Sequence, residues 1–169
     1  MACVTRSLAL SGQFVISCGT VTIDVNRSKV LLIRDRPTGE CMLPKGRKDI
    51  GESLEEAAER ETFEETGIRA RLTAMHMSTL ATGDSRRPIT EPIAVSQRVT
   101  DGVLKIIFWY IATADSMTPP VEGTQQENED FDTVWIDFGG INNTITFDDD
   151  KSIAHQAIAM VTGSQRNDV

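Results

Sequence analysis

Residues 46–68 read GRKDIGESLEEAAERETFEETGI, and this stretch decides both the fold and the chemistry that the sequence predicts. Ser53 is a suitable N-cap, and Glu56, three residues later, completes a capping box. The residues that follow are mostly strong helix formers, and Gly67 is a natural helix stop. We therefore expect a helix over residues 54–66, about three and a half turns long.

One face of this expected helix combines small apolar residues with carboxylates. At about 100° per residue, Glu64 falls at the edge of that face, and five residues fall on it: Leu54, Ala57, Ala58, Glu61 and Glu65. A solvated acidic helix is the ordinary alternative, but such a helix keeps its carboxylates opposite its apolar stripe. Carboxylates on a packing face repel one another, and their burial is costly without a partner. Oxygen ligands at this spacing suit Mg²⁺ or Mn²⁺, so we expect a divalent metal here.

The spacing within residues 46–68 resembles the Nudix box. Five residues separate Gly46 from Glu52, and seven separate Glu52 from the run RETFEETGI that begins at Arg60. That box is the signature of enzymes that hydrolyse a nucleoside or other diphosphate linked to a second group. Thr62 stands where the pattern has a hydrophobic residue. The resemblance implies the Nudix fold, an α/β (α+β) protein built as an α/β/α sandwich with a mixed central β-sheet. It also implies a phosphoanhydride hydrolase that uses Mg²⁺ or Mn²⁺.

The resemblance also assigns roles within the box. Glu61, Glu64 and Glu65 correspond to metal ligands, and Glu61 or Glu65 would help to activate the attacking water. Glu52 would support or complete the metal shell. Arg60 is expected to face away from the metal and to orient a glutamate through an ion pair, with an ordinary surface salt bridge as the alternative.

Some Nudix enzymes use a further carboxylate from outside the box. Glu127 or Glu129, shortly before the expected strand over residues 131–137, could supply it here. Four acidic residues lie close together in this segment, so ordinary exposed carboxylates remain the alternative for each.

Basic residues gather just before and within the start of the box. Five of the chain's 17 lysines and arginines lie within residues 34–48, against a net charge of −8. Clustered cations beside a metal site favour a polyanionic substrate, whereas scattered surface cations are the alternative. A sixth cation interrupts the apolar run over residues 103–111 and either points at the same phosphates or is a surface lysine. The expected substrate-binding residues are Arg34, Arg36, Lys45, Gly46, Arg47, Lys48 and Lys105.

A narrower resemblance concerns the substrate. LPKG at residues 43–46, together with RETFEE at residues 60–65, is similar to the branch of diphosphoinositol polyphosphate phosphohydrolases and diadenosine polyphosphate hydrolases. This implies inositol pyrophosphates as substrates, with dinucleoside polyphosphates second. Arg47 and Lys48 replace glycines of that branch and add positive charge. The alternatives are hydrolysis of a nucleoside diphosphate conjugate such as ADP-ribose, and a catalytically silent Nudix module that binds a ligand.

Length and composition narrow the class of protein. The 169 residues suit one domain, with a core over about residues 12–162 and short flexible tails. The acidic net charge disfavours nucleic-acid binding, and no stretch is apolar enough for a membrane helix. Three cysteines without metal-ligand spacing suggest reduced thiols in a cytoplasmic or nuclear protein, although a secretion leader removed earlier would leave no trace. The expected partner is a small polyphosphate.

The remaining elements follow from β-type alternation and turn residues. The pattern predicts a second helix over residues 148–161 and long loops over 44–51 and 116–130. Gly19 marks a bulge or a close approach of another segment. Residues 108–110, all aromatic, are expected in the core rather than stacked on a base. Strands are expected over residues 13–25, 29–36, 41–43, 68–80 and 131–137, and a hairpin joins residues 92–99 to 103–114.

Overall fold

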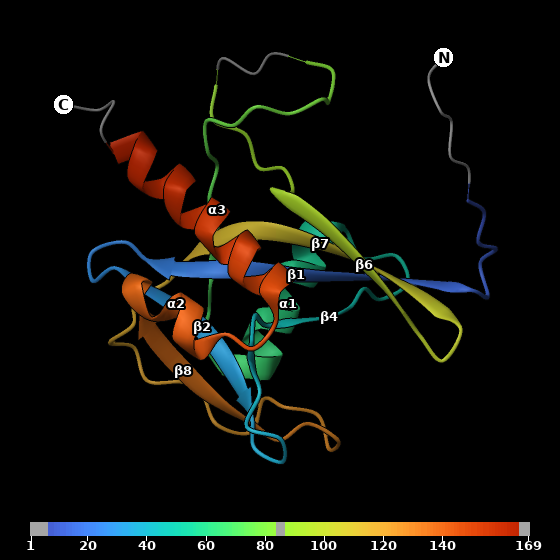
Figure 1. Cartoon of the computed structure of the whole chain (residues 1–169), viewed down its shortest axis with the longest axis horizontal. Coiled ribbons are helices and arrows are strands. Elements are labelled where there is room, and N and C mark those ends of the chain that lie inside the picture. Colours follow the sequence, from blue (N-terminus) through green and yellow to red (C-terminus); the bar gives the residue numbers. More distant parts are fainter. Residues whose placement is uncertain (1–6, 84–86, 166–169) are drawn as a thin grey trace.

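A computed structural model describes residues 7–83 and 87–165, which form a mixed sheet with helices on both faces (Figure 1). The strands are β1 (Phe14–Asp24), β2 (Lys29–Asp35), β3 (Cys41–Met42), β4 (Lys45–Arg47), β5 (Arg71–Leu72), β6 (Ala94–Thr100), β7 (Val103–Thr113) and β8 (Phe131–Asp137). The helices are α1 (Leu54–Thr66), the short 3-10 helix η1 (Phe138–Gly140), α2 (Ile141–Thr144) and α3 (Asp148–Gln165).

The sheet is organised around β1 and β7, which run parallel from the pair Phe14 and Leu104 to the pair Ile23 and Thr113. The central order is β3-β2-β1-β7-β5, and β4, β6 and β8 pair with β1, β7 and β2. The expected hairpin is confirmed: β6 and β7 are antiparallel and joined by Asp101 and Gly102. Both turn residues have positive φ, as a two-residue hairpin turn of this kind requires.

Two apolar clusters, one on each side of the sheet, explain the layers. Alternate residues of a strand point to opposite faces. On one face Trp109 and its neighbours pack with Ala154 and Ala157 of α3. On the other face Tyr110 and Cys18 pack with the alanines of α1. The expected α/β/α sandwich and the core position of these aromatic residues are therefore confirmed.

Four segments differ from the expected elements. Residues 45–47, expected in a loop, form β4 because they pair with β1. The polar run Lys-Gly-Arg has no apolar alternation from which a strand could be predicted. Residues 68–80 hold only β5 and an isolated bridge between Met75 and Ile89, so the long strand expected there is wrong. Residues 138–144 form η1 and α2. Helix α3 continues to Gln165, so residues 163–165 are helical and not part of a tail.

Some expectations fall on residues that the structure does not describe. Parts of the expected tails, residues 1–6 and 166–169, lie outside the described residues, as does Cys3. Cys18 and Cys41 are buried and free. Within residues 7–83 and 87–165, no helix combines the length and the apolar character that crossing a membrane would need.

Candidate active site

Helix α1 begins and ends as the sequence predicts. The Ser53 side chain accepts a hydrogen bond from the Glu56 N–H at 3.1 Å, and the Glu56 carboxylate accepts one from the Ser53 N–H at 2.9 Å. Gly67 ends the helix in the left-handed conformation, and its N–H donates to the Phe63 carbonyl. These caps determine which residues of α1 face the sheet.

Thr62, the departure from the box pattern, lies buried between α1 and β1. Its hydroxyl donates to the Ala58 carbonyl at 2.8 Å, and it shares a 2.8 Å hydrogen bond with the Thr20 hydroxyl. The Thr20 hydroxyl also bonds to the Thr22 hydroxyl at 2.7 Å. The polar side chain is tolerated here because β1 provides hydroxyl partners for it.

Two glutamates of α1 lie on the buried face of the helix. Glu61 and Glu65 are each only 4% exposed. Glu61 approaches β4 so closely that a Cβ at residue 46 would collide with its carboxylate, so a glycine is needed there. A similar approach explains Gly19, where a Cβ would collide with Pro44, Lys45 and Trp109. The expected close approach at Gly19 is thus confirmed.

Arg60 lies among the carboxylates of the box. Its Nε and Nη2 atoms bind both Glu52 oxygens at 2.7 and 2.9 Å, and Nη1 contacts Glu61 at 2.7 Å and Glu64 at 2.9 Å. The expectation that Arg60 faces away from the side of the expected metal ligands is wrong, although the expected ion pair is present. Buried carboxylates need a nearby positive charge, and Arg60 provides it. Glu52 faces Arg60 rather than the pocket described below.

Burial dominates the protonation of the two buried glutamates. It raises the pKa of Glu65 to about 8, although the Lys45 ammonium and backbone N–H oppose the shift. Burial also raises the pKa of Glu61, against the lowering effect of Arg60, and the Glu64 and Glu129 carboxylates raise it further. A cation bound beside these groups would favour their charged forms.

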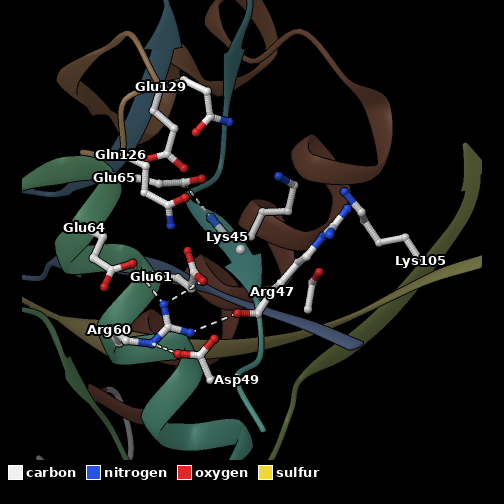
Figure 2. A pocket seen from close by; sticks show the side chains of 13 residues that line it. Lys45, Arg47, Asp49, Arg60, Glu61, Glu64, Glu65, Lys105, Gln126 and Glu129 are labelled. Carbon is white, nitrogen blue, oxygen red and sulfur yellow. Dashed lines mark hydrogen bonds and ion pairs between the residues drawn. The ribbon is translucent and has the colours of Figure 1, made fainter. Parts of the chain in front are cut away.

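The carboxylates open into a pocket of about 600 Å³ (Figure 2). Its walls come from β1, β4, α1, β7 and the loop before β8. In Figure 2 the glutamates lie on one side of β4, and the amino and guanidinium groups of Lys45, Arg47 and Lys105 lie on the other. The lining residues are Ser17, Lys45, Gly46, Arg47, Asp49, Arg60, Glu61, Glu64, Glu65, Lys105, Gln126, Asn128 and Glu129.

Strand register brings the cations together. In β4, Gly46 faces α1, so Lys45 and Arg47 face the other side of the sheet. Lys105 lies opposite Arg98 across the β6–β7 pair. The pKa of Lys105 is lowered first by burial and then by the positive charges of Lys45, Arg98 and Arg47. We call these four residues the cationic cluster.

Three expected substrate-binding residues lie elsewhere. Arg34 and Arg36 line a second pocket beside β8, and Arg36 pairs with Asp130 and Asp132 at 2.9 and 2.8 Å. Strand β2 lies between β1 and β8, which takes its end away from β4. Lys48 is not among the lining residues, and its ammonium donates to the Asp49 carbonyl at 2.9 Å. The structure therefore separates these cations from the carboxylates.

The loop before β8 contributes the remaining wall. Thr124 and Gln125 donate to the carbonyls of Glu64 and Glu65 at 2.8 and 3.0 Å, which ties the loop to the end of α1. Of the two loop glutamates considered, Glu129 lines the first pocket. Glu127 lines only the second.

Sequence reasoning missed five residues of this region. The hairpin register could have found Arg98, because it pairs a predicted strand position with Lys105. Asp49 lies inside the box itself and could have been found from its position. Ser17, Gln126 and Asn128 carry no local signal, since only the parallel pairing of β1 with β7 and the path of the loop place them here.

The donor chemistry fits a divalent metal ion. Glu61, Glu64 and Glu65 offer the hard carboxylate oxygens that Mg²⁺ and Mn²⁺ prefer. In the described part of the chain, no three acidic, histidine or cysteine side chains are already grouped to hold a metal. In this conformation the Arg60 guanidinium lies between Glu61 and Glu64 and supplies the positive charge that a metal ion would otherwise supply to them.

Known proteins share this architecture. A putative 8-oxo-dGTP diphosphatase of Bacillus subtilis (strain 168) is 47% identical over 57 residues, a match that spans 33% of this chain and 38% of that protein. A hydrolase of the NUDIX family from Clostridium perfringens has a TM-score of 0.61 at 23% identity, covering 90% of this chain and 99% of that one. The C. elegans Ap4A hydrolase has a TM-score of 0.56 at 20% identity, covering 84% and 94%. These two structures show the fold.

The family model of the NUDIX domain matches residues 15–156, which include helix α1, the glutamates of the box and all strands except the first residue of β1. The chain therefore belongs to the NUDIX domain family.

Proposed function

We propose that this chain is a divalent-metal-dependent hydrolase of phosphoanhydride bonds in highly phosphorylated small molecules. The observation that carries the proposal is the cationic cluster, of which Lys45, Arg47 and Lys105 line the same pocket as the three glutamates and lie across β4 from them. A metal site alone would suit any diphosphate. Three positive charges in the same pocket, with Arg98 next to Lys105 on the neighbouring strand, suit a substrate that carries further phosphates.

Within this proposal each group has a distinct task. Glu61, Glu64 and Glu65 hold the metal, which when bound would neutralise phosphate charge and lower the pKa of water. Glu65 also accepts the Lys45 N–H at 2.8 Å, so the metal side and the cationic side share one hydrogen bond. The Lys45 ammonium and the Arg47 guanidinium bind phosphate oxygens, and Lys105 extends the same surface.

Arg60, Glu52 and Glu129 support the reaction from the edges of the pocket. Arg60 orients Glu61 and Glu64 and is itself held by Glu52. Glu129 supplies a carboxylate opposite the helix, and its charge raises the pKa values of Glu61 and Glu65. Glu61 or Glu65 accepts the proton of the attacking water, since both carboxylates line the pocket in which the water would be activated.

Inositol pyrophosphates are the substrates we place first, and dinucleoside polyphosphates second. Trp109 and Tyr110, the largest aromatic side chains near the sheet centre, are fully buried and cannot stack on a base. A compact polyanion needs only cations, and the pocket supplies them. The fold shared with an Ap4A hydrolase keeps the dinucleoside substrate as the second candidate.

A substrate panel tests the proposal. Purified protein with Mg²⁺ should release phosphate from a diphosphoinositol polyphosphate faster than it cleaves diadenosine tetraphosphate or ADP-ribose. Glu64→Gln and Glu65→Gln should abolish hydrolysis. Lys45→Ala and Arg47→Ala should raise KM for the polyphosphates far more than for ADP-ribose. Arg71→Ala is a charge-matched control, because Arg71 is 80% exposed beyond the pocket.

Two outcomes would contradict the proposal. Full activity in both glutamine variants would remove the metal assignment. Equal KM changes for ADP-ribose and the polyphosphates would remove the role of the cationic cluster in substrate choice.

A further inference from the structure

Asp150, in the first turn of α3, is a buried carboxylate outside the site described above. Its side chain is 4% exposed, and Oδ2 accepts a hydrogen bond from the Leu43 N–H at 2.9 Å. Burial of a carboxylate is costly unless hydrogen bonds compensate for the lost water. A buried carboxylate is therefore expected to fix the position of the group that it binds. The group that Asp150 holds is the backbone two residues before Lys45.

The segment from Leu43 to Lys45 is fixed from both sides of the sheet. Pro44 has no N–H, so Leu43 and Lys45 carry the two neighbouring donors. The Leu43 N–H donates to Asp150 of α3, and the Lys45 N–H donates to Glu65 of α1 at 2.8 Å. The Pro44 carbonyl between them accepts from the Thr20 N–H at 3.3 Å. Two buried carboxylates on different helices therefore determine the path of the chain into β4.

Thr146, two residues before α3 begins, is bonded to Cys41, two residues before Leu43. The Cys41 N–H donates to the Thr146 hydroxyl at 2.9 Å, and the Thr146 N–H donates to the Cys41 carbonyl at 2.9 Å. Thr146 thus bonds to the same stretch as Asp150, but its partner Cys41 lies four residues before Lys45, whereas Leu43 lies two residues before it. The Thr146 contact anchors β3 and the Asp150 contact anchors the entry to β4, so variants of the two residues can be compared with each other.

We propose that Asp150 is a positioning residue that, through the Leu43 N–H, places Lys45 for binding of substrate phosphate. This inference rests on the proposed function, since it takes Lys45 to be a phosphate ligand. Asp150 does not line the pocket, and it reaches this segment through its hydrogen bond from the Leu43 N–H, although its carboxylate also feels the charges of Lys45 and Arg98. An asparagine oxygen could accept the same hydrogen bond, so the role requires an acceptor at residue 150 and not a charge.

The test compares Asp150→Ala with Asp150→Asn, with Lys45→Ala and with the combination of Asp150→Ala and Lys45→Ala. KM and kcat are measured on diadenosine tetraphosphate with Mg²⁺, and binding of inorganic tripolyphosphate is measured by calorimetry in EDTA. Asp150→Ala should raise KM and weaken tripolyphosphate binding about fivefold, the effect of one lost neutral hydrogen bond, with kcat nearly unchanged. Asp150→Asn should keep wild-type values.

Two comparisons separate positioning from general damage to the fold. Thr146→Val removes the hydroxyl contact to the Cys41 N–H and should leave KM unchanged even where it lowers the melting temperature. In the Lys45→Ala background, Asp150→Ala should raise KM no further, because the residue through which it acts is gone.

Three outcomes would overturn the role of Asp150: wild-type behaviour of Asp150→Ala, a loss in Asp150→Asn equal to that in Asp150→Ala, or an undiminished effect in the Lys45→Ala background. Failure of the proposed function looks different. A wild-type protein that binds tripolyphosphate but hydrolyses nothing would remove the proposed reaction, while the calorimetry would still decide on Asp150.

Discussion

Gly46→Ala should separate the stability of the protein from its activity. A Cβ at this position would overlap the Glu61 carboxylate, and Gly46 needs no unusual φ, so steric conflict is the whole perturbation. The three nearest atoms all belong to the end of the Glu61 side chain, which can rotate. Glu61 would therefore move, and β4 would stay paired with β1.

The two expected magnitudes differ widely. Overpacking costs roughly 1–3 kcal/mol, and a movable carboxylate places this case near the lower end, about 1 kcal/mol. That corresponds to a fall in melting temperature of about 2–4 °C for a chain of this size. A catalytic group displaced by about 1 Å can cost on the order of 100-fold in rate. Gly46→Ala should therefore remain folded and lose about 100-fold in kcat.

Two other glycines provide matched controls. At Gly139 a Cβ would meet nothing, so Gly139→Ala should preserve both melting temperature and kcat. At Gly19 a Cβ would meet the Pro44 carbonyl and the Trp109 ring, which cannot rotate away, so Gly19→Ala should lose stability first. Calorimetry and single-turnover hydrolysis measure the two quantities. A Gly46→Ala protein with wild-type kcat would refute the reasoning that Gly46 exists to admit Glu61.

Three further predictions concern buried polar groups. Arg60→Met should destabilise the protein by about 3 kcal/mol in EDTA, because Glu61 and Glu64 lose their positive partner. Mg²⁺ should recover part of that loss in a thermal melt. An equal rise in melting temperature with Mg²⁺ in wild type and variant would count against this prediction. Asp24→Asn should lower the free energy of unfolding by about 1–3 kcal/mol at pH 7. Burial raises the pKa of Asp24, but hydrogen bonds from Ser116 and Arg27 outweigh it and hold that pKa well below its usual range. The stabilisation is therefore fully present above about pH 4 and declines as pH falls from there towards the folded-state pKa. In urea titrations the difference between the two proteins should be constant above about pH 4 and shrink steadily below it, without vanishing at about pH 3. Thr62→Val should cost no more than about 1 kcal/mol in the same assay, because the remaining Thr20 hydroxyl keeps Thr22 as a partner.

The carboxylate side of the site could be read from the sequence because it is local. Caps and helix periodicity place Glu61 and Glu65 on one face without knowledge of any other element. The close approach of Gly46 to Glu61 was not predicted, because Gly46 was expected only as a substrate-binding residue. What the sequence did not show was the direction of Arg60, because a charge on a helix edge can turn either way until its partners are known.

The cationic side could not be read in the same way, because it depends on which strands become neighbours. Arg34 and Arg36 lie within 15 residues of Lys48 in the chain, yet β2 carries them to β8. Lys105 is 60 residues from Lys45, yet it reaches the pocket because β7 pairs in parallel with β1, whose other edge holds β4.

A parallel pair of strands has no tight turn in the sequence from which the pairing could be predicted. The β6–β7 hairpin does have such a turn, and its register places Arg98 beside Lys105 in the cationic cluster. The same argument explains the place of Asp150, since nothing near residue 150 in the chain indicates that α3 begins beside Leu43. On the proposed function, the groups that carry the reaction lie in one continuous stretch, while those that choose the substrate come together through contacts between segments far apart in the sequence. Variants in α3 or β6 should therefore change the relative KM values for different polyphosphate substrates, while the enzyme still hydrolyses a phosphoanhydride bond.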